Sequence, residues 1–94
     1  MKGPLADAMP EISRFLGIVI TMYFKDHNPP HFHVQYNDYR AQIAIASLGT
    51  IEGQLPPRVL SLVVEWASMH RDELLANWTD LSTTGQFHKI EPLA

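Results

Sequence analysis

Three histidines and an aspartate occur in the segment 26–33, which reads DHNPPHFH. His31 and His33 are two positions apart, so on a β-strand their side chains would leave the same face about 7 Å from each other. Imidazole nitrogens at that spacing can bind one zinc-like divalent ion, and His27 or Asp26 would supply a third ligand. We therefore predict Asp26, His27, His31 and His33 as metal ligands, with a divalent metal as the cofactor.

The same histidines could act without a metal. Because unperturbed imidazoles titrate near neutral pH, His31 and His33 can divide the roles of general acid and general base. Tyr23, Lys25 and Arg40 are expected on the same face, where a cation would stabilise the charge that develops on a phosphate. This second interpretation makes His31, His33, Lys25 and Tyr23 the catalytic residues of a hydrolase that cleaves phosphodiesters such as RNA.

Two further interpretations of this face stay open. Gln35, Arg40 and Gln42 could form a binding surface for a protein or for single-stranded nucleic acid, because they share the predicted polar face. Alternatively, the histidines only satisfy backbone groups around a stiff loop. Pro29 and Pro30 make that loop stiff, since each proline fixes a backbone φ angle and removes a hydrogen-bond donor.

Alternating apolar and polar residues predict the strands that would position these side chains. Because neighbouring residues of a strand point to opposite faces, such alternation is typical of a sheet with one buried face. The predicted strands are residues 17–25, 31–36 and 39–46, with a weaker fourth strand at residues 50–54.

Two turns would fold these strands into an antiparallel meander. A turn at residues 26–30 would pair Tyr23 with His33. The two-residue turn at 37–38, Asn-Asp, would pair His33 with Gln42. Both pairings put the apolar side chains on one face and the polar side chains on the other, as a correct register requires.

A long amphipathic helix is predicted after the strands, because apolar residues recur every three or four positions from Pro57 onwards. Proline is favourable at the first helical position, and Gly85 is a typical stop. The helix could break near His70. Its apolar stripe would cover the apolar face of the sheet, and residues 87–93 would return as a short extended segment. The predicted fold is therefore α+β: a three- to four-stranded antiparallel meander with one long C-terminal helix.

Length and composition place these elements in one domain. The chain has 94 residues, of which 46% are hydrophobic and 18% are charged, in proportions typical of a globular protein. We expect a single domain over residues 9–94 and a flexible N-terminal extension over residues 1–8. The sequence has no cysteine, which excludes disulfides, thiolate metal ligands and cysteine nucleophiles. No apolar run approaches the roughly 20 residues that span a bilayer, so we expect a cytoplasmic protein without membrane contact.

Several motifs of the chain resemble the bacterial domain of unknown function 4160 family. The most specific of them is PPHFHV at residues 29–34. The others are MPEISRF (9–15), GIVITMY (17–23), LPPR (55–58), EWA (65–67), HRDEL (70–74) and IEPL (90–93). Gln35 stands where a basic residue is frequent in that family, and Arg40 where an acidic residue is frequent. The charge of the polar face is therefore expected to be distributed differently here.

The resemblance implies a small bacterial protein, often encoded beside a domain of unknown function 2442 protein in pairs suspected to be toxin–antitoxin modules. Our leading hypothesis is therefore a protein-partner module of toxin–antitoxin type, with a small protein of that second family as the partner. The alternative is the histidine-based hydrolase or ribonuclease that uses His27, His31 and His33, with or without a metal. RNA and a second copy of the chain are further candidate partners.

Overall fold

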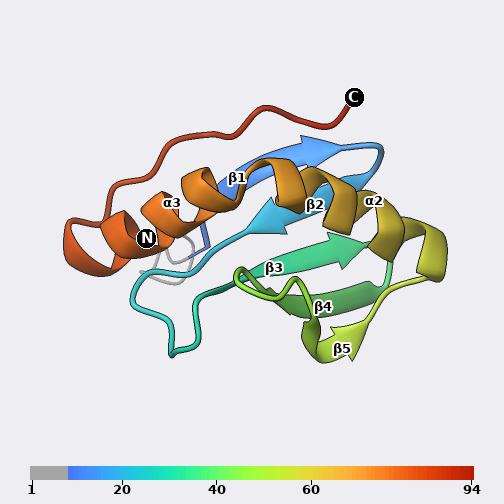
Figure 1. Ribbon diagram of the computed structural model, residues 1–94, viewed down its shortest axis with the longest axis horizontal. Helices are drawn as coiled ribbons and strands as arrows, with labels where there is room; N and C mark the ends of the chain where they lie inside the picture. The colour runs from blue at the N-terminus through green and yellow to red at the C-terminus, as the bar shows by residue number, and fades with distance from the viewer. Residues whose placement is uncertain (1–8) are drawn as a thin grey trace, which may run out of the picture.

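The protein is described by a computed structural model of residues 9–94, so the predicted N-terminal extension, residues 1–8, lies outside the described residues. Five antiparallel strands form one sheet in the order of the chain, and each strand pairs with the next. Two helices cover one face of this sheet (Figure 1). The elements are β1 (Glu11–Phe15), β2 (Ile18–Thr21), β3 (His31–Tyr36), β4 (Tyr39–Ala44), β5 (Thr50–Gln54), α2 (Pro57–Met69) and α3 (Arg71–Thr83).

The α+β class and the antiparallel meander are confirmed, but the sheet has five strands instead of three or four. The strand missing from the prediction is β1. Its residues do not alternate between the two faces, because Ile12 and the neighbouring Ser13 are both buried. The pairing of β1 with β2 shifts between Glu11 and Ser13, as in a β-bulge, which breaks the period of two.

The β3–β4 hairpin has the predicted register. His33 pairs with Gln42, and Phe32 pairs with Ile43. The two-residue turn contains Asn37, whose φ of 52° lies in the left-handed region that asparagine tolerates better than most residues. This hairpin fixes which side chains accompany His33 on the polar face.

The predicted β2–β3 register is wrong by two residues, because His33 pairs with Thr21 and not with Tyr23. β2 ends at Thr21, and a turn at Phe24 and Lys25 interrupts the extended backbone, with a φ of 52° at Lys25. A shift of two residues leaves every side chain on its predicted face. It also lengthens the connection between the strands to residues 22–30.

Two helices replace the single long helix of the prediction. His70 separates α2 from α3, and its φ of −129° and ψ of 24° lie outside the helical range, so the break falls at the predicted place. Pro57 occupies the first turn of α2, as the sequence predicts. Beyond α3, Gly85 adopts a φ of 77° and its N–H donates to the carbonyl of Asp80 at 2.9 Å.

The core lies between the sheet and the helices, and Trp66 of α2 is at its centre. Its indole is completely buried, with ring centroids 5.4 Å from Phe15 and 6.1 Å from Phe32. Within residues 9–94, no helix covers the opposite face of the sheet (Figure 1). Side chains that point to that opposite face are therefore accessible to a ligand.

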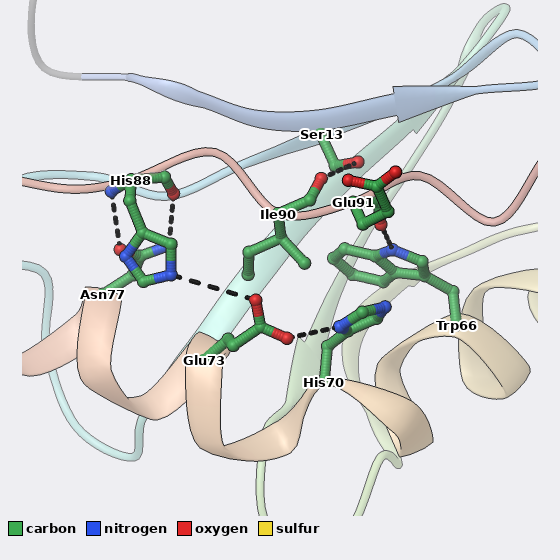
Figure 2. Close-up of polar contacts among 8 residues, drawn as sticks. All are labelled: Ser13, Trp66, His70, Glu73, Asn77, His88, Ile90 and Glu91. Carbon is green, nitrogen blue, oxygen red and sulfur yellow. Dashed lines mark hydrogen bonds and ion pairs between the residues drawn. The ribbon is translucent and has the colours of Figure 1, made fainter.

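The segment after α3 runs beside β1 (Figure 1). The N–H of Ile90 donates to the carbonyl of Ile12 at 3.0 Å, and the hydroxyl of Ser13 donates to the carbonyl of Ile90 at 2.9 Å. The indole N–H of Trp66 donates to the carbonyl of Glu91 at 2.8 Å (Figure 2). The bond from Ile90 occupies the carbonyl of Ile12 at the β1 edge, and the bonds from Ser13 and Trp66 hold the segment in place there, where another strand could otherwise pair.

Asn77 of α3 fastens the same segment from the other side. Its side chain is completely buried, donates to the carbonyl of His88 and accepts from the N–H of His88, both at 2.9 Å (Figure 2). Nearby, one oxygen of Glu73 is hydrogen-bonded to Nδ1 of His70, and the other lies 4.0 Å from Nε2 of His88. We call His70, Glu73 and His88 the tail cluster.

Candidate functional site

Asp26, His31 and His33 converge at the start of β3, and we call them the loop cluster. The connection of residues 22–30 brings Asp26 back to the two histidines of β3. Nε2 of His31 lies 3.0 Å from Oδ2 of Asp26, and Nε2 of His33 lies 3.1 Å from the same oxygen. β2 ends at Thr21, so Asp26 lies inside this longer connection and not at the base of a tight turn.

His31 differs from its predicted placement, because its side chain is only 6% exposed. The sequence predicts that His31 and His33 share the face turned away from the helices. Instead, the ring of His31 lies 5.2 Å from that of Trp78 on α3. His31 is the first residue of β3, where it pairs with Ala44 of β4 but has no partner in β2, whose pairing with β3 ends at His33. Its Nδ1 lies 2.8 Å from the carbonyl oxygen of Pro29.

His33 lies on the polar face, as predicted. The ring of Tyr23 stacks on it in a nearly parallel arrangement, with centroids 4.3 Å apart and planes 14° apart. Tyr23 therefore accompanies His33 although the two residues are not paired in the sheet. The side chain of His33 is 19% exposed, so it is the most accessible member of the loop cluster.

Asp26 is a carboxylate in a crowded environment. Burial by itself would raise the pKa of Asp26. The hydrogen bond to His33, the N–H of His27 at 2.8 Å from Oδ1, and the electrostatic interaction with His31 and His33 lower it. The net effect lowers the pKa of Asp26 below its usual range. Asp26 is therefore ionised at neutral pH and can hold a histidine or a cation.

A pocket of about 260 Å³ opens on the polar face beside the loop cluster. His33 forms part of its wall, so this residue belongs both to the loop cluster and to the pocket. The other predicted residues that line the pocket are Tyr23, Gln35, Arg40 and Gln42. All three predicted binding residues and two of the four predicted catalytic residues thus surround one cavity.

The remaining predicted site residues lie outside this pocket. His31 and Asp26 do not line the pocket, and Asp26 contacts both His31 and His33 in the loop cluster. Lys25 is exposed in the turn after β2. His27 is also exposed, and only its backbone N–H contributes to the cluster, by its bond to Asp26. In the described part of the chain, the group whose ligand atoms lie within 4.8 Å of one another is Asp26, His31 and His33, without His27.

Other residues that line the pocket were not identified from the sequence, among them Thr21, Glu52 and Gly53. Thr21 and Glu52 line the pocket, and the amide of Gln42 donates to Glu52 at 3.3 Å. Alternation along residues 50–54 would have placed Glu52 on the polar face. Gly53 is different, because only glycine fits its position. Its φ is 77°, and a Cβ added there would lie 2.1 Å from the carbonyl oxygen of Arg40. No pattern in the sequence signals that close approach.

Comparison with known proteins places the chain beside one family. The family model described as Domain of unknown function (DUF4160) matches residues 17–79, which include the loop cluster and all the strands after β1. No curated protein matches the chain, and no solved structure matches it. Among the helices of residues 9–94, none has the length and apolar character needed to cross a membrane.

Proposed function

This chain belongs to the DUF4160 family, a domain of unknown function, and we propose from the geometry of its site that it is a histidine-centred hydrolase of phosphodiesters. The observation that carries this proposal is the double role of His33. Its ring lines the pocket on the polar face, and its Nε2 lies 3.1 Å from Oδ2 of Asp26. A histidine that is oriented by a half-buried carboxylate and lines a cavity is a typical arrangement for a general base.

The hydrogen bond to Asp26 decides which nitrogen of His33 would act. When the Nε2–H of a neutral His33 donates to the carboxylate, Nδ1 keeps its lone pair. Within residues 9–94, Nδ1 of His33 has no hydrogen-bond partner. Nδ1 would therefore take the proton from the attacking hydroxyl, which is water or the 2′-hydroxyl of RNA. The new oxygen–phosphorus bond then forms while the leaving oxygen departs and takes a proton from solvent.

Arg40 supports a phosphodiester as the substrate class. Its side chain is at the pocket wall, and it forms no ion pair with a described residue. A guanidinium beside the reacting phosphate would stabilise the negative charge that develops in the transition state. Asp26 acts through His33 in this scheme, so it is a positioning residue.

The proposal is tested by cleavage of a labelled, mixed-sequence single-stranded RNA by the purified full chain. We expect His33→Gln to reduce the cleavage rate by roughly 10²–10⁴-fold, the usual contribution of a general base. His27→Gln is the matched control, because His27 is a neighbouring exposed histidine whose ring is outside the pocket. Equal cleavage by His33→Gln and the unmodified chain, or no cleavage by the unmodified chain, would contradict the proposal.

The second candidate function is a protein-partner module of toxin–antitoxin type, and the β5 edge of the sheet favours it. All five residues of β5 are exposed, and Ile51 keeps 46% of its surface exposed. The opposite edge, β1, is occupied by the segment around Ile90. An open edge strand can accept a strand from a partner through backbone hydrogen bonds. The resemblance to the family implies a small protein of the domain of unknown function 2442 type as that partner.

This second candidate is tested by mixing the purified chain with a purified protein of that type and measuring the mass of the complex. We expect a heterodimer that is weakened by Ile51→Lys, which places a charge on the open edge. Leu75→Lys is the control, since Leu75 is equally exposed on α3, away from β5. A complex that both variants preserve would show that the partner does not use the β5 edge.

A further inference from the structure

The hydrogen bond between His31 and Pro29 determines the chemical state of the other nitrogen of His31. A carbonyl oxygen only accepts hydrogen bonds, so Nδ1 of His31, 2.8 Å from the carbonyl oxygen of Pro29, must carry a hydrogen. A neutral imidazole carries one hydrogen, and its second nitrogen then has a lone pair. In neutral His31 that nitrogen is Nε2, which lies 3.0 Å from Oδ2 of Asp26.

In neutral His31, an unprotonated nitrogen would therefore lie 3.0 Å from a carboxylate oxygen, in a site that excludes most solvent. The side chains of His31 and Asp26 are 6% and 12% exposed. Two acceptors at this distance repel each other unless a positive charge lies between them. That charge is either a second proton on His31 or a metal ion bound by the same atoms.

The third group at this point distinguishes a metal site from a simple ion pair. Nε2 of His33 lies 3.1 Å from the same Oδ2, so three potential ligand atoms from three residues converge there. We propose that Nε2 of His31, Nε2 of His33 and Oδ2 of Asp26 bind one zinc-like divalent ion. Metal–ligand bonds of about 2.0–2.2 Å in tetrahedral geometry separate the ligand atoms by about 3.3–3.6 Å. The two distances to Oδ2 would lengthen by a few tenths of an ångström to admit the ion, and all three ligand atoms lie within 4.8 Å of one another.

Each of the three ligands is also held by a second group, as metal ligands usually are. The carbonyl of Pro29 fixes the ring of His31, and the N–H of His27 fixes the carboxylate of Asp26. Tyr23 stacks on the ring of His33. Two imidazoles and one carboxylate favour zinc and related transition metals over Mg²⁺, which prefers oxygen ligands. Three protein ligands leave one position on a tetrahedral ion for water or substrate.

As a cofactor for the chemistry in the pocket, the ion rests on the proposed function, because His33 is common to both sites. With Nε2 on the ion, neutral His33 would carry its hydrogen on Nδ1, so a water activated by the ion would replace Nδ1 in removing the proton. As a binding site, it can be tested without any substrate. We would remove metals from the full chain with a chelator, dialyse it, and titrate it with ZnCl₂ in a calorimeter. We expect one Zn²⁺ per chain, competition by Co²⁺ and no competition by Mg²⁺. The visible spectrum of bound Co²⁺ would report a four-coordinate site with nitrogen ligands.

The variants compare two carboxylates that each lie between two histidines. Asp26→Asn and His33→Gln should weaken Zn²⁺ binding by more than the roughly 10–100-fold that loss of an outer-shell group costs. Glu73→Gln, in the tail cluster, and His27→Gln should leave Zn²⁺ affinity unchanged. Circular dichroism confirms that each variant is folded before its affinity is compared. The Co²⁺ spectrum then shows whether a folded variant has lost a ligand.

Three results would overturn the metal site. They are the absence of stoichiometric Zn²⁺ binding, equal binding by Asp26→Asn and the unmodified chain, and loss of binding in Glu73→Gln or His27→Gln. If no stoichiometric Zn²⁺ binding is found, a second proton on His31 supplies the positive charge beside Asp26 in place of a metal ion. Zinc binding without RNA cleavage would support the metal site and contradict the hydrolase. RNA cleavage by the metal-free chain that depends on His33, without zinc binding, would do the reverse.

Discussion

The loop cluster and the tail cluster both place a carboxylate between two histidines, but they arrange the atoms differently. In the loop cluster, both imidazoles approach the same oxygen of Asp26, at 3.0 and 3.1 Å. In the tail cluster, the imidazoles approach different oxygens of Glu73, and one of these distances is 4.0 Å. The side chain of Glu73 is 44% exposed, whereas that of Asp26 is 12% exposed.

The loop cluster brings potential metal ligands to one point, whereas the tail cluster joins two segments of the chain. His31 and His33 come from one strand, and the connection before that strand brings Asp26 to meet them at one point. The tail cluster instead links His70, at the junction of α2 and α3, to His88 in the segment beside β1. Convergence on one atom suits the binding of an ion, whereas contacts on two oxygens suit the fastening of one segment to another.

The largest effect on stability is expected from Asn77, which holds the backbone of His88 beside the tail cluster. Asn77→Ala removes a completely buried amide and its two hydrogen bonds to the backbone of His88, so the free energy of unfolding should fall by about 2–4 kcal/mol. Urea unfolding measures this loss. Thr79→Ala, on the exposed surface of the same helix, should change it by less than about 0.5 kcal/mol. If the two losses were equal, water would be replacing Asn77 and the comparison of the clusters would need revision.

Replacing each carboxylate by an amide compares the clusters directly. In chelator-treated protein, Asp26→Asn should lower the free energy of unfolding by about 1.5–3 kcal/mol, the usual range for hydrogen bonds to a charged group. Glu73→Gln should lower the free energy of unfolding by less than about 1 kcal/mol, because water competes with His70 and His88 for the exposed carboxylate. Parallel urea titrations test both values. Similar losses in the two variants would mean that burial of Asp26 does not strengthen its contacts.

The acid dependence of stability should also depend on Asp26. The pKa of Asp26 is lower in the folded protein than its ordinary value of 3.8, so its stabilising contribution is complete above that value. The contribution is lost as the pH falls through the lower, folded pKa. The unfolding temperature should therefore fall as the pH is lowered through the acid range, and it should fall less in Asp26→Asn than in the unmodified chain.

Glu11 can be compared with Asp26 as a second source of the loss of stability in acid. A hydrogen bond from Arg14 lowers the pKa of Glu11, so it contributes with the same sign. Glu11→Gln should reduce the acid-induced fall in stability less than Asp26→Asn does, because the side chain of Glu11 is more exposed to solvent than that of Asp26. The opposite order would indicate that surface pairs, and not the loop cluster, determine the response to acid.

The smallest effect is expected from the ring of His88. Its side chain is 50% exposed and 4.0 Å from Glu73, while the bonds to Asn77 come from the His88 backbone. His88→Ala should therefore change the free energy of unfolding by less than about 0.5 kcal/mol. A larger loss in urea unfolding would show that the histidine ring itself fastens the tail.

Local patterns predicted the parts of the site that depend on local geometry. The two-residue turn at Asn37 and the alternation on either side fixed the β3–β4 register, and with it the neighbours of His33 on the polar face. Arg40 and Gln42 were placed correctly for this reason. Because side chains alternate with a period of two, an error of two residues in the register leaves the predicted faces correct. The pairing of His33 with Thr21, predicted with Tyr23, is such an error.

The remaining features depend on contacts that sequence spacing does not contain. His31 is buried because Trp78 of a distant helix lies against it. Asp26 reaches both histidines because the chain turns at Lys25, a residue that gives no turn signal. β1 contains a shift in pairing, and such a bulge disturbs the alternation on which strand prediction depends.

The position of the tail has a consequence for synthesis on the ribosome. Strands β1 to β5 are neighbours in the chain and can pair as they emerge, but Ser13 and Ile90 are 77 positions apart. The edge of β1 therefore stays unpaired until residues 88–91 have left the exit tunnel. Unpaired edges of nascent chains can join to one another. The time during which this protein is prone to aggregate is thus set by how quickly its two helices and the segment after them are translated.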